Sequence, residues 1–379
     1  MKNSLQLGII GGIKVTVHWT FVLLIGWIVF INLRVGSTAE NTLWSVLFVL
    51  LIFGCVVLHE FGHAFAAKRF GIKTRSITLL PIGGLASLES MPEKPKQELI
   101  VAIAGPVVNL LIAAILIPFV NPSDVFTVDS IVAVHSGNLL PNLFSVNIVL
   151  AVFNMLPAFP MDGGRVLRAL LGFKFKRHIA TRIAASIGQA ISVGFILLGL
   201  FYNPFLVFIG IFIFLGAQAE AGSTRTQFMM ANFTVRDAMI RDFHTLDYND
   251  PISSAVQLLL NGQEKNFLVM QNEKPAGTLD RNQIIKALSE KGKDSKIEDA
   301  MHKSALSFQQ NTPLKEAWPR MQMNRQIIAP IYDGSKLIGA LDNENILEFV
   351  MIREATEKSN VRQLVVPPDD SDKVKILYK

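Results

Sequence analysis

Long apolar runs fill roughly the first 220 residues, and an alternation of polar and apolar positions replaces them from Asn232 on. Six runs are long enough, or nearly so, to cross a hydrocarbon core of ~30 Å. The fourth and sixth are short, so we expect them to be tilted, broken or partly buried in protein. The pattern predicts a polytopic α-helical membrane domain. The runs are roughly Val15–Leu33, Leu43–Ala67, Leu99–Val120, Leu139–Phe153, Ile183–Phe201 and Pro204–Ala219.

A small β element is predicted beside these runs. The segment Gly71–Leu88 combines partial alternation and β-branched residues with a central Pro-Ile-Gly-Gly at 81–84. This is typical of a hairpin, and Gly8–Val17 has the pattern of a further strand. An exposed strand edge there suits a substrate that binds in extended form. A purely structural hairpin that covers the helix end explains the pattern equally well.

The second part of the chain contains an internal repeat with a constant offset of 62 residues. Val235–Met239 recurs as Ile297–Met301, and Gly277–Asp280 recurs as Gly339–Asp342. A register kept without gaps over this length indicates a duplicated unit. We expect each copy to form a short strand, a helix, two strands and a second helix. The predicted domains are 1–222, 232–355 (copies at about 232–291 and 294–355) and a polar tail at 356–379.

Composition agrees with a membrane protein, since 50% of the 379 residues are hydrophobic and only 17% are charged. Two loops, after the second and fourth runs, are rich in Lys and Arg, whereas Asn121–Asn138 contains neither. Basic loops face the cytoplasm. We therefore expect six spans in the cell membrane, with both termini and the repeat in the cytoplasm. The net charge of +6 is explained by these loops and predicts no nucleic-acid partner.

Ionisable residues end the second apolar run in the pattern His59-Glu60-x-x-His63. Two histidines at i and i+4 lie on one face of a helix and can hold one metal ion. Glu60 can then act as general base toward the attacking water. The alternative is a packed, non-catalytic histidine pair. Polar groups are costly in a membrane span, so their position favours the catalytic interpretation.

A catalytic zinc takes three protein ligands and keeps one position for water. Asp162 is the best third ligand, because it follows the fourth run at the same depth as the histidines. Pro157, Pro160 and the Gly163-Gly164 pair break the helix there and let non-helical backbone line a cavity. The only cysteine, Cys55, lies in an apolar run, which excludes a cysteine-based zinc site.

Two amides in the apolar runs are candidate substrate- or oxyanion-lining residues. Asn154 can donate a hydrogen bond to a substrate carbonyl or a tetrahedral oxyanion, or can serve as a packing or capping group. Asn109 either points into the active-site cavity or bonds across helices.

These motifs together resemble the site-2 protease family of intramembrane zinc metalloproteases, over roughly residues 5–220. The resemblance rests on His59–His63, Pro81–Gly84, Gly105–Asn109 and Asn154–Arg165. It implies regulated intramembrane proteolysis of single-span membrane proteins, such as anti-sigma factors, tethered transcription factors or signal-peptide remnants. It assigns binding of one Zn²⁺ to His59, His63 and Asp162, water activation to Glu60 and lining of the site to Asn109 and Asn154.

The repeat resembles a tandem pair of cystathionine-beta-synthase (CBS) domains, an α/β module that often binds adenine nucleotides. Such nucleotide sites carry Ser or Thr, then Asp three residues on, after the Gly of the last strand. This sequence has Asp280 and Gln283 in the first copy, and Asp342 and Asn345 in the second. An acidic residue at a ribose or phosphate contact argues against nucleotide binding. We expect a regulatory or dimerising module, which includes a homodimer through the CBS pair.

A second class of function is a transporter or channel gated by the CBS pair. Against it, the intramembrane polar residues form a hydrolase set and the spans show no inverted repeat. Zinc stoichiometry and peptide cleavage by the purified protein distinguish the two classes.

Overall fold

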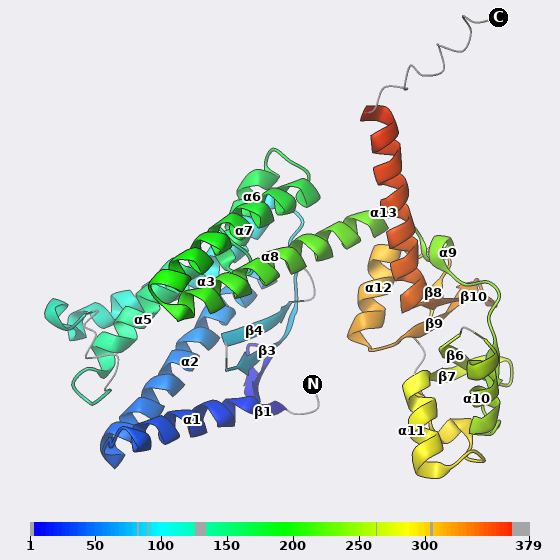
Figure 1. The fold of residues 1–379 in the computed structure, drawn as a ribbon, viewed down its shortest axis with the longest axis horizontal. Coiled ribbons are helices and arrows are strands. Elements are labelled where there is room, and N and C mark those ends of the chain that lie inside the picture. The colour runs from blue at the N-terminus through cyan, green and yellow to red at the C-terminus, as the bar shows by residue number, and fades with distance from the viewer. Residues whose placement is uncertain are drawn as a thin grey trace, which may run out of the picture. The chain divides into compact units, whose positions relative to one another are not determined.

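A computed structural model of the chain describes residues 4–81, 83–88, 91–125, 134–262, 264–303 and 306–365. The chain forms two compact units, Met1–Thr224 and Arg225–Lys379. Helices and one small sheet make up the first unit, and two three-stranded sheets with flanking helices make up the second (Figure 1).

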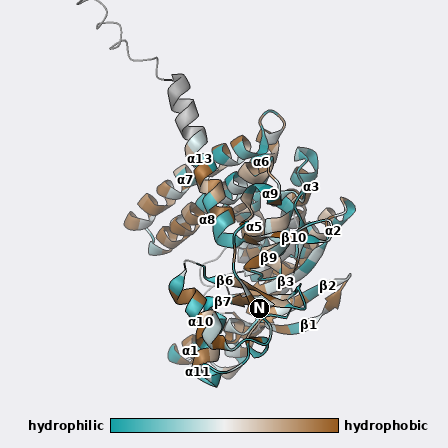
Figure 2. Cartoon of the chain, turned by 90° about the vertical axis from the view of Figure 1, so that its right-hand side faces the viewer, coloured by the Kyte–Doolittle hydropathy of each residue, from teal (hydrophilic) through white to brown (hydrophobic). Residues whose placement is uncertain are grey.

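The helices of the first unit follow the six predicted apolar runs. Four of them, α2, α3 with its 3-10 extension, α7 and α8, are long and apolar enough to cross a membrane, whereas α1 and α5 are shorter apolar helices. Figure 2 shows hydrophobic residues along α7 and α8. The bounds are α1 (Thr20–Arg34), α2 (Ala39–Arg69), α3 (Pro95–Leu116), α5 (Leu139–Asn154), α6 (Asp162–Gly172), α7 (Arg177–Phe201) and α8 (Pro204–Met230), with 3-10 turns at Ile117–Phe119 and Pro122–Asp124.

Two predicted runs differ from the helices that form. The first run was expected to span from Val15, but residues up to His18 belong to a strand, and α1 begins only at Thr20. The β-branched sequence Val-Thr-Val at 15–17 favours a strand, and the neighbouring strand β3 pairs with it. The sixth run was expected to be short, yet α8 continues to Met230, and Met229 and Met230 at its end are buried in a hydrophobic core.

A four-stranded sheet packs against α2 in the order β1-β2-β3-β4. Strands β1 (Ser4–Ile10) and β2 (Ile13–His18) form a hairpin, as do β3 (Thr74–Leu80) and β4 (Gly83–Leu88), and β2 pairs with β3 in parallel. The hairpin predicted at 71–88 is confirmed. The single strand predicted at 8–17 turns back at Gly11-Gly12, both with positive φ, so it forms two strands. Buried residues of the sheet pack against Phe61 and Ala64, beside the His-Glu-x-x-His motif.

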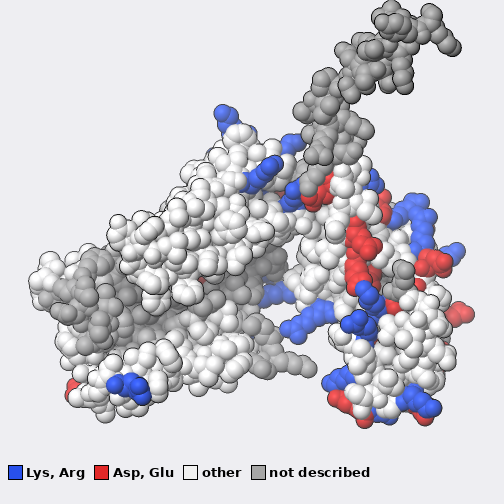
Figure 3. Space-filling model, viewed as in Figure 1, with Lys and Arg blue, Asp and Glu red and all other residues white. Residues whose placement is uncertain are grey.

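The second unit confirms the order of elements predicted for the repeat. The elements α10, β6 and β7 begin and end 62 residues before α12, β9 and β10. Helix α13 continues to residue 365, beyond the expected start of a polar tail. Charged side chains gather on this unit, whereas the visible face of the first unit carries few (Figure 3). The bounds are α9 (Val235–Ala238), β5 (Thr245–Asp247), α10 (Ile252–Asn261), β6 (Asn266–Gln271), β7 (Lys274–Asp280), α11 (Arg281–Lys291), a 3-10 turn (Ile297–Asp299), β8 (Phe308–Gln309), α12 (Leu314–Met323), β9 (Ile328–Asp333), β10 (Lys336–Asp342) and α13 (Asn343–Val365).

Candidate metal centre

The three predicted ligands come together from two helices. His59 and His63 lie one turn apart on α2, and Asp162 is the first residue of α6. All three side chains are buried. His59 Nε2 lies 3.1 Å from His63 Nε2, and Asp162 Oδ2 lies 3.2 Å and 3.0 Å from these two nitrogens. The three atoms therefore form a nearly equilateral triangle.

This triangle fits a zinc ion. Tetrahedral Zn²⁺ with bonds of ~2.0 Å separates its ligand atoms by ~3.3 Å. The observed separations are slightly shorter than this value, and two imidazoles with one carboxylate are a donor set that Zn²⁺ accepts in catalytic sites. Among the described residues, these three are the group of His, Cys, Asp or Glu side chains placed to hold a metal.

Two glycines allow α3 to approach the histidines closely. A Cβ at Gly62 would lie 2.7 Å from the carbonyl oxygen of Ala104. A Cβ at Gly105 would lie 2.2 Å from His63 Nε2 and 2.6 Å from His59 Nε2. Any side chain at 105 would therefore press on both metal-binding nitrogens, which is the physical reason for glycine at this position.

Each histidine is oriented by a hydrogen bond from its other ring nitrogen. His59 Nδ1 lies 2.5 Å from Asn109 Oδ1, and His63 Nδ1 lies 2.7 Å from the carbonyl oxygen of Val101. Both partners are oxygen acceptors, so each Nδ1 carries the proton and donates it. Each Nε2 is thereby left with its lone pair for the metal.

Of the two roles left open for Asn109, the structure shows a bond across helices, since its fully buried side chain contacts His59. Its lining of the site stays a prediction. Asn109 Nδ2 donates to Asn147 Oδ1 (2.8 Å), and Asn147 Nδ2 donates to the Leu143 carbonyl and to Cys55 Sγ. This chain of bonds fixes which end of the Asn109 amide faces His59. Asn147 was missed in the sequence, although an amide in an apolar run is itself a signal of a buried partner.

The Asp162 carboxylate contacts the guanidinium of Arg165 on the same helix. Its Oδ2 faces the histidines, and its Oδ1 lies 3.3 Å from Arg165 NH1. The positive charge of Arg165 beside it favours the ionised form of the Asp162 carboxyl. The carboxylate is thus kept ionised, as a metal ligand requires.

The predicted break between α5 and α6 is present, because α5 ends at Asn154 and α6 begins at Asp162. The glycine pair lets α6 pack on this loop. A Cβ at Gly163 would lie 2.1 Å from the Leu156 carbonyl oxygen, and one at Gly164 would lie 2.6 Å from the Phe159 nitrogen. The loop therefore delivers Asp162 to the histidines at a defined position.

Glu60 follows His59 on α2, Asn154 ends α5, and both side chains are partly exposed. Strand β4, at the edge of the sheet, passes Glu60: a Cβ at Gly84 would lie 2.9 Å from Glu60 Cγ and 3.4 Å from its Oε1. Asn154 Nδ2 donates one hydrogen bond to the Leu150 carbonyl (2.9 Å), which leaves its second hydrogen for another acceptor. The roles expected of Glu60 and Asn154 stay predictions.

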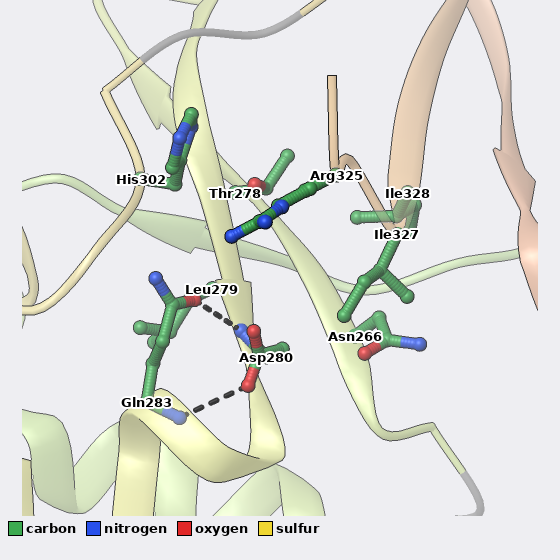
Figure 4. A pocket seen from close by; sticks show the side chains of 9 residues that line it. All are labelled: Asn266, Thr278, Leu279, Asp280, Gln283, His302, Arg325, Ile327 and Ile328. Carbon is green, nitrogen blue, oxygen red and sulfur yellow. Dashed lines mark hydrogen bonds between the residues drawn. The ribbon is translucent and has the colours of Figure 1, made fainter. Parts of the chain in front are cut away.

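A pocket of the second unit lies between the two repeats (Figure 4). At its floor Asp280 Oδ1 accepts from the backbone nitrogens of Asn282 and Gln283, and Gln283 Oε1 accepts from the Asp280 nitrogen. The two side chains thus cap α11 and place a carboxylate where a helix N-terminus would attract phosphate. The lining residues are Asn266, Thr278, Leu279, Asp280, Gln283, His302, Arg325, Ile327 and Ile328.

Comparison with known proteins identifies the family. The model of "Peptidase family M50" matches residues 47–124 and 121–199. The chain is 32% identical over 359 residues to "Zinc metalloprotease MJ0392" of Methanocaldococcus jannaschii, which covers 94% of this chain and 99% of that protein. The chain belongs to peptidase family M50.

Further similarities cover parts of the chain. "Stage IV sporulation protein FB" of Bacillus subtilis is 31% identical over 37% of this chain and 44% of its own length. A solved structure, "Site-2 Protease from Methanocaldococcus jannaschii", has 36% identity, covers 57% of this chain and 95% of that chain, and gives a TM-score of 0.43. The CBS domain model matches residues 235–290. This M50 protein is thus a zinc metallopeptidase and a multi-pass membrane protein with a CBS module.

Proposed function

We propose that this metallopeptidase hydrolyses peptide bonds within or near the transmembrane segments of membrane proteins. The observation that carries the proposal is the triangle of buried ligand atoms, two of which belong to a helix long and apolar enough to cross a bilayer. A catalytic centre on a spanning helix is accessible to a chain that itself enters the membrane. The substrate class is therefore single-span proteins, such as anti-sigma factors, tethered transcription factors or signal-peptide remnants, cleaved in regulated intramembrane proteolysis.

The proposed chemistry assigns one step to each polar side chain. Bound zinc would polarise the scissile carbonyl and lower the pKa of water toward ~7. Glu60 takes a proton from the attacking water and passes it to the leaving amine, so the proton is returned within one turnover. The second amide hydrogen of Asn154 is available to the oxyanion. His59, His63 and Asp162 hold the metal throughout.

The substrate is proposed to bind in extended form along β4. A helical substrate hides its peptide carbonyls in its own hydrogen bonds, so it must unwind before hydrolysis. Strand β4 lies at the edge of the sheet and Gly84 contacts Glu60. An added strand there would make main-chain hydrogen bonds close to the general base, which supports recognition of many different sequences.

The proposed topology has six spans, with both termini and the CBS pair in the cytoplasm. Helices α1 and α5 supply the two spans beyond the four long apolar helices. The basic loops after the second and fourth runs support this orientation, which places the metal centre toward the cytoplasmic face.

The CBS pair is proposed to be a regulatory or dimerising module. The carboxylate that caps α11 argues against an adenine nucleotide in the pocket of Figure 4. Isothermal titration of the full-length protein with AMP, ADP and ATP tests this point. Absence of binding heat is expected, and saturable binding of any of the three would contradict it.

The membrane-protein fragments of cells that make the wild type or Glu60→Gln test the proposed substrate class. Cells with the variant should accumulate truncated single-span proteins that cells with the wild type convert to shorter, soluble fragments. The new termini should map within or beside transmembrane segments. Identical fragment patterns in the two cell types, or cleavage confined to soluble loops, would overturn the proposal.

A further inference from the structure

A cluster of three charges, two of them buried, joins three helices outside the metal centre. Arg168 of α6 is 1% exposed and Glu98 of α3 is 3% exposed. Arg168 Nε donates to Glu98 Oε1 (2.7 Å), and its NH2 lies 2.6 Å from the same oxygen. Arg168 NH1 donates to Glu220 of α8. We call these three residues the charge clamp.

The charge clamp tolerates little displacement. A buried charge that loses its partner is left uncompensated in a medium of low dielectric, so Arg168 and Glu98 must stay paired, whereas the Glu220 side chain is 36% exposed. The planar guanidinium further restricts the directions from which two carboxylates can meet it. Arg168 also lies over the ring of Phe159, 5.0 Å from its centroid, and so contacts the loop that precedes α6.

The position of Asp162 depends on this clamp. Asp162 begins α6, a helix of 11 residues, and Arg168 lies six residues further along it. A helix this short moves as a rigid rod, so a shift at Arg168 is passed to Asp162. The ligand-atom distances from Asp162 Oδ2 to the histidines, 3.2 Å and 3.0 Å, leave little room for such a shift.

We propose that Arg168, held by Glu98 and Glu220, is a positioning residue that sets the place of the Asp162 carboxylate for metal binding. This inference rests on the proposed function, in which Asp162 is a ligand. Glu220 adds a consequence, because α8 is one continuous helix whose last residues, Met229 and Met230, are buried in the core of the second unit. The clamp is thus attached to the helix that leads into the CBS pair.

The test measures the zinc affinity of full-length purified variants by competition with a chelating indicator, together with the visible spectrum of the cobalt-substituted protein. Arg168→Met removes the guanidinium, Arg168→Lys keeps its charge, and Glu220→Ala removes one partner. Lys286 and Glu290 form an exposed pair on α11 at 4.0 Å, so Lys286→Met and Glu290→Ala are matched controls.

Arg168→Met should weaken zinc binding about tenfold, in the range seen when groups that orient metal ligands are removed. Arg168→Lys should weaken zinc binding less than Arg168→Met does, and Glu220→Ala should weaken it by up to about tenfold, because a partner of Arg168 is lost. The visible spectrum of the cobalt-substituted protein should change most in Arg168→Met and less in Arg168→Lys and Glu220→Ala. The spectra and zinc affinities of Lys286→Met and Glu290→Ala should match those of the wild type.

Unchanged zinc affinity and an unchanged cobalt spectrum in folded Glu220→Ala and Arg168→Lys would overturn the positioning role. If Arg168→Met does not fold, these two variants decide the question. A wild type that binds no zinc would instead contradict the proposed function, so the two failures are distinguishable.

Discussion

Gly105 shows, at the scale of single residues, how much the metal centre depends on one missing side chain. Its Cα faces the Nε2 atoms of both histidines, at a distance where a Cβ has no room. In the sequence, Gly105 stands out only as part of the motif Gly105–Asn109, which does not say what the glycine contacts. Which atoms the glycine meets follows from the register between α2 and α3, and a sequence pattern carries no information about this register.

Gly105→Ala tests this contact. The added methyl group should displace one or both imidazoles, lower zinc affinity at least tenfold and abolish peptidase activity, since removal of a group that only orients a metal ligand already costs about 10–100-fold. Gly54→Ala is the matched control, because Gly54 lies on α2 with nothing within 4 Å of its Cβ position. Zinc content and cleavage rate measure the effect. Full zinc occupancy and activity in Gly105→Ala would contradict the geometry.

At the scale of elements, the pairing of strands was partly predictable. The hairpin at 71–88 and the duplicated second unit follow from local turn residues and a constant offset. Residues 15–17 were predicted both as the end of a strand at Gly8–Val17 and as the start of the first apolar run, because their apolar residues suit a strand and a helix. Their partner β3 lies about 60 residues away, and this pairing adds a tertiary contact in favour of the strand.

The buried carboxyl of Asp342, which caps α13, predicts a pH dependence in the second unit. Burial is the main cause of a raised pKa, although Asn266 donates to its Oδ2. A raised folded-state pKa gives stability that is present at acid pH and is lost as pH rises through that pKa. Asp342→Asn keeps the cap and removes the charge, so it should raise the Tm of the second unit near neutral pH.

Calorimetry of the full-length protein at several pH values checks the Asp342 prediction. The difference between Asp342→Asn and wild type should shrink as pH falls toward ~4, where the carboxyl of the unfolded chain becomes protonated. Asp333→Asn, at an exposed position of β9, should leave the Tm unchanged at every pH. A lower Tm for Asp342→Asn at pH 7 would contradict the assignment.

At the scale of the whole molecule, the ligand set was predictable from the sequence, but its supports were not. His59, His63 and Asp162 carry a spacing motif and a membrane depth that can be read from the chain. Asn147 and Arg168 act through contacts between helices that lie far apart in sequence, so no local pattern gives their partners. Arg165 contacts Asp162 from the same helix, three residues further on.

Labelling of introduced cysteines tests the proposed topology. In a Cys55→Ser background, Lys174→Cys should react with a membrane-impermeant maleimide only from the cytoplasmic side. Ser123→Cys should react only from the opposite side. Both residues are exposed, so the reagent can reach them. Labelling of both positions from the same side would rule out the six-span arrangement with cytoplasmic termini.

The most direct test of the account is cleavage of a single-span substrate by wild type and Glu60→Gln, each reconstituted into proteoliposomes with its zinc content measured. Gln keeps the shape of Glu but cannot accept the proton. We expect one zinc per chain in both proteins, cleavage within or beside the substrate's transmembrane segment by the wild type, and loss of cleavage in Glu60→Gln. A Glu60→Gln protein that cleaves the substrate at the wild-type rate would contradict the account.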